Sequence, residues 1–250
     1  MQSDASSEQG RIGSEVPSGW TAPRTPYRSL GGPARLVQLL LAVFTLVTLA
    51  AVVSDWLEVN LLTRLLHDPA SVLDAEANAV DSRQALLALL QAGAYLLTAV
   101  GFLLWFHRAY TNLPALGMEP LPYAPGWVVG AWLVPFLNLF RPKQIMDNIW
   151  RGSDPDKPSR LDGVWHHGPV PALVHWWWAV FLLSWLVDRV LVVLLRNGST
   201  TVEGLRAASI GTLASDGLGL VLGLLCLEMV RRATRRQQAR ATRLADAPPA

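Results

Sequence analysis

The chain has 250 residues, of which 51% are hydrophobic and only 16% are charged, and it contains 11 tryptophans and one cysteine. A soluble domain typically carries about 25% charged residues, so this composition argues against a soluble protein. The single cysteine excludes an intramolecular disulfide. The net charge of +2 is small, but the charges are unevenly placed along the chain.

The first 33 residues are polar and rich in serine, glycine and proline. A cleavable signal peptide would open with a short basic region followed directly by an apolar core, and this segment has no such core. It cannot bury enough apolar surface to offset the entropy of ordering. We therefore expect residues 1–33 to form a disordered cytoplasmic tail, with Pro33 in the first turn of the helix that follows.

Four long apolar runs follow this tail. Each is about as long as a helix must be to cross roughly 30 Å of hydrocarbon. The predicted spans are residues 36–53, 86–106, 171–195 and 210–230. Together they predict an all-α integral membrane bundle over residues 34–231, followed by a basic cytoplasmic tail over residues 232–250.

The segment between the first two spans is acidic and fits an external loop. Leu57, Leu61 and Leu65 recur in it at helical spacing. The first helix is therefore expected either to continue outside the bilayer as an amphipathic extension or to break into a helix on the membrane surface.

Residues 127–140 form a fifth apolar run that is too short to span comfortably. Pro135 lies in its middle, where it removes a helical hydrogen bond and clashes with the preceding turn. Basic residues follow the run, beginning with Arg141 and Lys143. We expect this run to re-enter the membrane or to lie at its surface.

The positive charges predict the orientation, because lysine and arginine are enriched on cytoplasmic flanks. Arginines precede the first span and follow the last, so both termini are expected in the cytoplasm, which requires an even number of crossings. The alternatives are five spans with an external C-terminus, or a pair of short tilted crossings. The first alternative places two basic clusters outside the cell.

A short amphipathic helix is predicted over residues 142–151. Ile145, Met146 and Ile149 fall on one face, and Lys143 and Asp147 fall on the opposite face. This pattern fits a helix in the membrane interface or an ordinary surface helix on a cytoplasmic loop.

A dense pattern of aromatic, basic and amide side chains lies between Trp105 and Trp150. It comprises Trp105, Phe106, His107, Arg108, Ala109, Tyr110, Thr111, Asn112, Leu113, Ala115, Leu116, Gly117, Trp127, Trp132, Pro135, Asn138, Leu139, Arg141, Pro142, Lys143, Met146, Ile149 and Trp150. This stretch resembles the bacterial multi-pass membrane family catalogued as domain of unknown function 4328. The resemblance implies a bacterial inner-membrane protein and no particular reaction.

Three polar residues in this stretch form a candidate polar pocket: Arg108, Asn112 and Asn138. Arg108 and Asn112 share a helical face just beyond the second span, and Asn138 lies near the apex of the run broken by Pro135. The favoured interpretation is structural, because backbone groups freed inside a membrane must find partners. The alternative is a polar pocket open to the cytoplasm.

Three charged residues near the ends of the last two spans form the second candidate site. An ionised side chain at mid-bilayer costs about 3 kcal/mol, so such residues tend to pair or face water. Arg189 and Asp216 are expected at similar depth, which predicts an interhelical contact with Asp188 facing elsewhere. Alternatively, the third span ends at Val187. An ion pathway would need further polar groups, and Gln91 looks isolated in its span.

Motifs for catalysis, cofactors and metals are lacking. No carboxylate or thiol completes a metal set with the histidines, and no His-Glu-x-x-His, Gly-x-Ser-x-Gly or glycine-rich phosphate loop occurs. The C-terminal arginines are expected to bind anionic lipid rather than nucleic acid. Gly219 and Gly223 form a Gly-x-x-x-Gly pair that suits helix packing within the chain.

These observations favour a non-enzymatic interaction or regulatory protein of the cell (inner) membrane, with a membrane-protein partner possible and no cofactor. The alternative is a small-solute or ion transporter with a polar layer at Asp188, Arg189 and Asp216. It would require inward-facing polar side chains on several spans.

Overall fold

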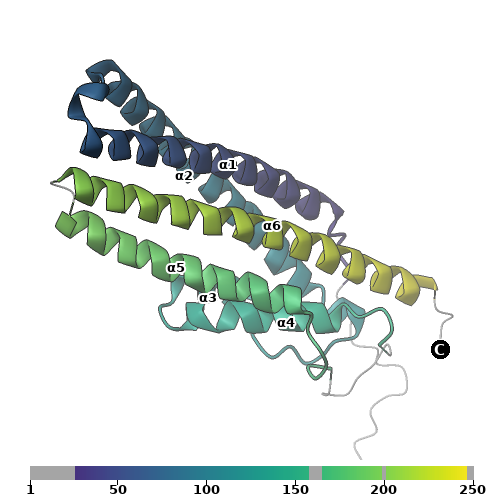
Figure 1. Ribbon diagram of the computed structural model, residues 1–250. Coiled ribbons are helices and arrows are strands. Elements are labelled where there is room, and N and C mark those ends of the chain that lie inside the picture. Colours follow the sequence, from purple (N-terminus) through teal and green to yellow (C-terminus); the bar gives the residue numbers. More distant parts are fainter. Residues whose placement is uncertain (1–25, 158–164, 199–200, 247–250) are drawn as a thin grey trace, which may run out of the picture.

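The computed structural model describes residues 26–157, 165–198 and 201–246 (Figure 1). These residues form six α-helices and three short 3-10 helices and contain no strand. The α-helices are α1 (Gly31–His67), α2 (Asp74–Thr111), α3 (Trp127–Leu133), α4 (Arg141–Gly152), α5 (Ala172–Gly198) and α6 (Val202–Asp246). The 3-10 helices are η1 (Pro69–Ser71), η2 (Pro114–Leu116) and η3 (Leu137–Leu139). The predicted all-α fold is confirmed.

Four of these helices, α1, α2, α5 and α6, are long and apolar enough to cross a membrane. Large leucines on their outward faces are exposed, among them Leu39, Leu46, Leu89 and Leu97. Such a surface is typical of helices that face lipid, whereas a soluble monomer rarely exposes large contiguous apolar patches. The protein is a multi-pass membrane protein.

The long helices extend beyond the predicted spans. α1 continues without a break to His67, so the alternative of a separate surface helix does not occur. α1 starts at Gly31, which places Pro33 in its first turn as expected, while residues 1–25 of the predicted tail lie outside the described residues. α6 continues to Asp246, so most of the predicted basic tail is helical.

The long helices lie in the order α2, α1, α6, α5, with α1 packed against both α2 and α6 and α6 packed against α5 (Figure 1). We call the end of the bundle with the start of α1 and the end of α6 the terminus end. The opposite end, with the α1–α2 and α5–α6 connections, is the loop end. The helices α3 and α4 lie near the terminus end, where they contact α2 and α5.

Small residues allow α1 to approach its neighbours closely. A Cβ atom added to Gly101 of α2 would lie 2.7 Å from Leu40 Cδ1, and one added to Gly223 of α6 would lie 2.8 Å from Thr45 Oγ1. Thr98 adds a hydrogen bond from its Oγ1 to the Leu40 carbonyl, at 3.2 Å. The Gly-x-x-x-Gly pair therefore serves packing within the chain, as expected.

The main hydrophobic core lies at the terminus end and joins helices that are far apart in sequence. Its largest fully buried members include Trp105 and Tyr110 of α2, Ile145 of α4, and Trp165. A smaller cluster around Leu61, Leu62 and Val80 holds the loop end together.

The apolar run over residues 127–140 is not one helix. α3 ends at Leu133, Val134 is extended, and η3 begins at Leu137 after Phe136 adopts a φ of 65°. Pro135 explains this break, because it disfavours helical geometry in the residue before it. The seven residues of α3 extend about 10 Å, so this helix is too short to be a fifth span.

The helix predicted over residues 142–151 is α4, which packs on both faces. Ile145, Met146 and Ile149 are buried as the apolar pattern predicts. Asp147 and Asn148 on the expected polar face are buried too. The reason is that Leu121 and Tyr123 before α3 and His166 after α4 lie beside this face, so α4 is packed into the folded core.

Candidate functional site

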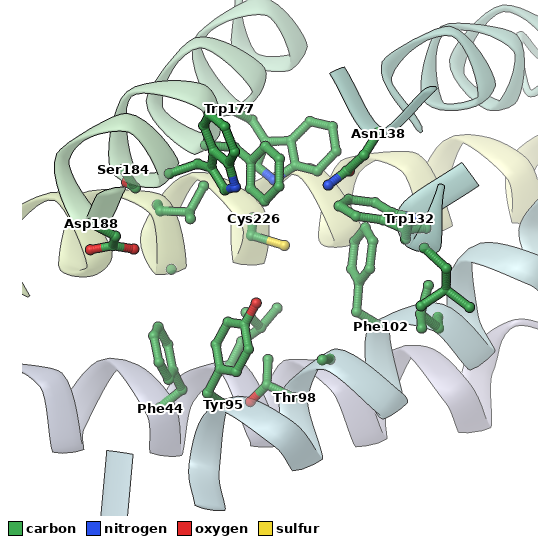
Figure 2. A pocket seen from close by; sticks show the side chains of 18 residues that line it. Phe44, Tyr95, Thr98, Phe102, Trp132, Asn138, Trp177, Ser184, Asp188 and Cys226 are labelled. Atoms are coloured by element: carbon green, nitrogen blue, oxygen red, sulfur yellow. The ribbon is translucent and has the colours of Figure 1, made fainter. Parts of the chain in front are cut away.

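A groove of about 450 Å³ lies between α2 and α5 in the middle of the bundle (Figure 2). It exists because these two helices, at the two ends of the row, are not packed against each other along their lengths in the described part of the chain. They meet instead near the terminus end, where the rings of Phe102 and Trp177 have centroids 6.1 Å apart. The volume falls within the roughly 300–1,000 Å³ typical of ligand sites.

The two outer helices each line the groove with one helical face. α2 contributes Tyr95, Thr98, Ala99, Phe102 and Leu103, and α5 contributes Trp177, Phe181, Ser184, Trp185 and Asp188. Both sets follow helical spacing, so each presents a continuous stripe. Leu41 and Phe44 of α1 and Leu222 and Cys226 of α6 form the back wall.

An aromatic cluster closes the groove toward the terminus end. Trp132 of α3 stands edge-on to Phe102 of α2 and to Phe181 of α5, with centroid distances of 5.9 and 5.6 Å. Edge-to-face pairs of this kind are favoured by the ring quadrupole. Because Trp132 contacts both helices, α3 acts as a floor that bridges them.

The two ends of the groove carry its most polar side chains. Figure 2 shows Asn138 and Trp132 at the closed end and Asp188 at the other end. Asp188 is the only charged side chain among the described residues that line the groove. Its Oδ1 accepts a hydrogen bond from Ser215 Oγ of α6.

A network of polar side chains, which we call the polar layer, crosses the bundle near the loop end. Its members are Ser54, Asp55, Glu58, Arg83, Gln84, Gln91, Ser209 and Asp216. Gln84 Nε2 donates to Asp55 Oδ1 at 3.0 Å, and Ser209 Oγ donates to Glu58 Oε1 at 2.9 Å. Asp55 is only 2% exposed, and its Oδ2 has no donor in the described part of the chain.

The polar layer changes the expected partner of Asp216. Gln91 Nε2 of α2 donates to both carboxylate oxygens of Asp216, at 3.0 and 2.9 Å. Among the described residues no ion pair joins Arg189 to Asp216; the Arg189 guanidinium instead lies 5.4 Å from the Trp185 ring centroid on its own helix. Gln91 is thus not isolated. Because α1 packs against both α2 and α6, these two helices lie close enough for the Gln91 side chain to reach Asp216.

The three residues of the expected polar pocket are not brought together. Asn112 is buried, accepts from the Arg28 backbone N–H at 3.1 Å and donates to the Arg28 carbonyl at 2.7 Å. Arg108 donates to the Ser29 carbonyl. Asn138 lies apart from both, at the floor of the groove, and its buried Oδ1 has no partner in the described chain.

A second polar cluster holds the terminus end together. Gln237 Nε2 of α6 donates to the Ala109 carbonyl at 3.0 Å and to Ser153 Oγ at 3.1 Å. Arg240 is 1% exposed and donates to the carbonyls of Leu116, Asp154 and Lys157. These bonds anchor the end of α6 to the connections before α3 and after α4.

The side chains of this cluster serve backbone carbonyls rather than an open pocket. Lys157 donates from Nζ to the Trp165 carbonyl at 2.9 Å. Burial lowers the pKa of its ammonium group, and the nearby Asp154 carboxylate opposes that shift. Glu228 forms local ion pairs with Arg231 and Arg232 just before this cluster.

The groove offers mainly aliphatic and aromatic surface, with the Asp188 carboxylate at one end. The described residues include no group of three histidine, cysteine or acidic side chains that could hold a metal ion. Cys226 lies on the buried back wall. The groove residues could not be predicted from the sequence, because the side chains that line the groove and those that face outward on the same helices are both apolar. Their high aromatic content is the one feature of the sequence that could have pointed to them.

The family model of the domain of unknown function (DUF4328) matches residues 68–235, which include α3, α4, most of the polar layer and all of the groove lining except Leu41 and Phe44 of α1. No curated protein and no solved structure matches the chain. The matched segment covers more than half of the 250 residues. The chain therefore belongs to this family, as its resemblance between Trp105 and Trp150 indicated.

Proposed function

We propose that this family member is a non-enzymatic membrane protein that holds an apolar molecule from the bilayer in the groove between α2 and α5. The observation that carries the proposal is the groove itself, which the described residues line mainly with aliphatic and aromatic side chains and with one carboxylate, Asp188, at one end. Because the helices on either side of it are not packed together, the opening faces the surrounding lipid. Binding of a ligand or a partner there is an interaction function that needs no reacting groups.

The proposed orientation places both termini in the cytoplasm of a bacterial cell. Arginines gather at the terminus end, on α6 beyond Met229 and around Arg35, and acidic side chains gather at the loop end. This distribution follows the positive-inside rule. The groove then opens toward the outer half of the inner membrane. The exposed arginines of α6 are proposed to contact anionic lipid, without a role for nucleic acid.

A transporter is the second candidate, because the polar layer brings Asp55, Gln91 and Asp216 together inside the bundle. Intramembrane carboxylates mark ion pathways in many transporters. The groove between the layer and the terminus end is lined mainly by aliphatic and aromatic side chains, however. A solute or ion path would need polar partners there, so the binding function is better supported.

A photoreactive lipid tests the proposal. The purified protein is reconstituted with a phospholipid that carries a diazirine on one acyl chain, and the cross-linked residues are mapped by mass spectrometry. We expect cross-links inside the groove at Phe181 and Leu103. Ala99→Phe, which fills the groove, should remove them, whereas Leu97→Phe, which adds a ring on the lipid-facing side of α2, should not.

Labelling restricted to outward-facing leucines in the unaltered protein would contradict the proposal. An ion flux in proteoliposomes that depends on Asp216 but not on an open groove would favour the transporter.

A further inference from the structure

The length of the groove matches one lipid tail. Its lining on α5 runs from Trp177 to Asp188, and eleven helical steps correspond to about 16 Å. Half of the hydrocarbon core of a bilayer is about 15 Å thick. A single acyl chain of one leaflet therefore fits the groove from end to end, with its methyl end at the aromatic floor around Trp132.

The polar layer marks the level of the headgroups. Ionised side chains are costly within the hydrocarbon, so Asp55, Glu58 and Arg83 place the boundary of the apolar region near the loop end. Asp188 lies at this level, because its carboxylate accepts from Ser215, the neighbour of Asp216 on α6. A lipid with its tail in the groove has its headgroup beside Asp188.

The end of the groove beside Asp188 carries charged side chains of both signs. Asp188 is exposed, and among the described residues its carboxylate accepts a hydrogen bond from the neutral hydroxyl of Ser215 and forms no ion pair. Arg189 is also exposed, lies over Trp185 at the edge of the groove, and is paired with no carboxylate among the described residues. A carboxylate and a guanidinium on adjacent residues complement a headgroup that carries an ammonium group and a phosphate.

We infer that the occupant of the groove is a phospholipid with an ammonium-bearing zwitterionic headgroup, of the phosphatidylethanolamine type, from the leaflet at the loop end. One acyl chain lies between α2 and α5, the ammonium group contacts Asp188, and the phosphate contacts Arg189. This inference rests on the proposed function and adds the chemical class of the ligand. In the proposed orientation, the leaflet is the outer one.

Lipid competition tests this inference. The protein is placed in nanodiscs that contain equal amounts of phosphatidylethanolamine and phosphatidylglycerol with identical acyl chains, and retained lipid is counted by native mass spectrometry. A charge-assisted hydrogen bond contributes roughly 1.5–3 kcal/mol, so we expect at least about a tenfold preference for phosphatidylethanolamine. Asp188→Asn should abolish the preference while a lipid remains bound.

Two matched variants keep the outcomes distinct. Glu203→Gln removes an exposed carboxylate at the loop end that does not line the groove, and it should leave the preference unchanged. Ala99→Phe should remove the retained lipid of either kind. Equal retention of the two lipids by the unaltered protein, or an unchanged preference in Asp188→Asn, overturns the headgroup assignment alone. Retention that Ala99→Phe does not reduce overturns the binding function as well.

Discussion

The contact between α1 and α2 and the gap between α2 and α5 are built from different side chains. Gly101 and Thr98 of α2 let α1 approach closely enough for a side chain to bond a backbone carbonyl. Where α2 and α5 do meet, the contact is between large rings, such as Phe102 and Trp177. Small residues permit close helix approach in a membrane, and bulky rings hold the helices apart. The α1–α2 contact, which we call the closed side of α2, holds the bundle together. The groove between α2 and α5, which we call the open side, leaves room for a ligand.

The largest effect is expected at Arg240, which closes the terminus end. Arg240→Ala removes several bonds to backbone carbonyls in a buried site, so we expect a loss of about 3 kcal/mol in the free energy of unfolding. Unfolding in mixed micelles, followed by circular dichroism, measures it. Arg243→Ala is the control, because Arg243 is exposed and should cost less than about 1 kcal/mol. Equal losses in the two variants would show that α6 does not depend on this anchor.

A smaller effect is expected where α2 packs against α1. Gly101→Leu inserts a side chain against Leu40 and should cost about 2 kcal/mol through overpacking. Gly93→Leu on the same helix is the matched control, because nothing lies within 4 Å of the added Cβ atom. The same unfolding measurement compares them. If Gly93→Leu were the more damaging variant, the assignment of the closed and lipid-facing sides of α2 would be wrong.

The third-largest effect is expected for the coupling free energy between the Gln91 and Asp216 side chains. Interhelical hydrogen bonds in membranes average about 0.6 kcal/mol and reach about 1.7 kcal/mol, so a double-mutant cycle with Gln91→Leu and Asp216→Leu should give about 1 kcal/mol. A parallel cycle with Arg189→Leu and Asp216→Leu should give no coupling beyond error. Coupling in the second cycle but not in the first would restore the ion pair that the sequence suggested.

The smallest effect on stability is expected on the open side. Ala99→Phe adds a ring to an unfilled space, so the free energy of unfolding should change by less than about 0.5 kcal/mol in detergent. A loss as large as that of Gly101→Leu would mean that α2 and α5 are tightly packed at this depth. The thermal midpoint in detergent, read by intrinsic fluorescence, distinguishes these outcomes.

The parts of the structure that follow from local patterns could be predicted from the sequence. The four long helices, the break at Pro135 and the α4 helix arise from hydropathy, proline geometry and helical spacing. The choice of partners could not be predicted, because Asp216 meets Gln91 only after α1 has packed between α2 and α6. The buried role of Arg240 was hidden for a similar reason, since its carbonyl partners come from distant connections.

The groove was the least predictable feature. Its lining side chains are apolar, as are their lipid-facing neighbours on the same helices. Ala99 lines the groove, whereas Leu97, two residues earlier on the same helix, is exposed on the outer surface. This difference becomes visible only once the order of the packed helices is known. Helix order is a property of tertiary packing, which no single segment encodes.

The decisive experiment is a cryo-electron microscopy map of the protein in nanodiscs that contain phosphatidylethanolamine. We expect a continuous elongated density between α2 and α5, from the Trp132 ring to the Asp188 carboxylate. Helices α2 and α5 in direct contact along this stretch, with no space between them, would contradict it.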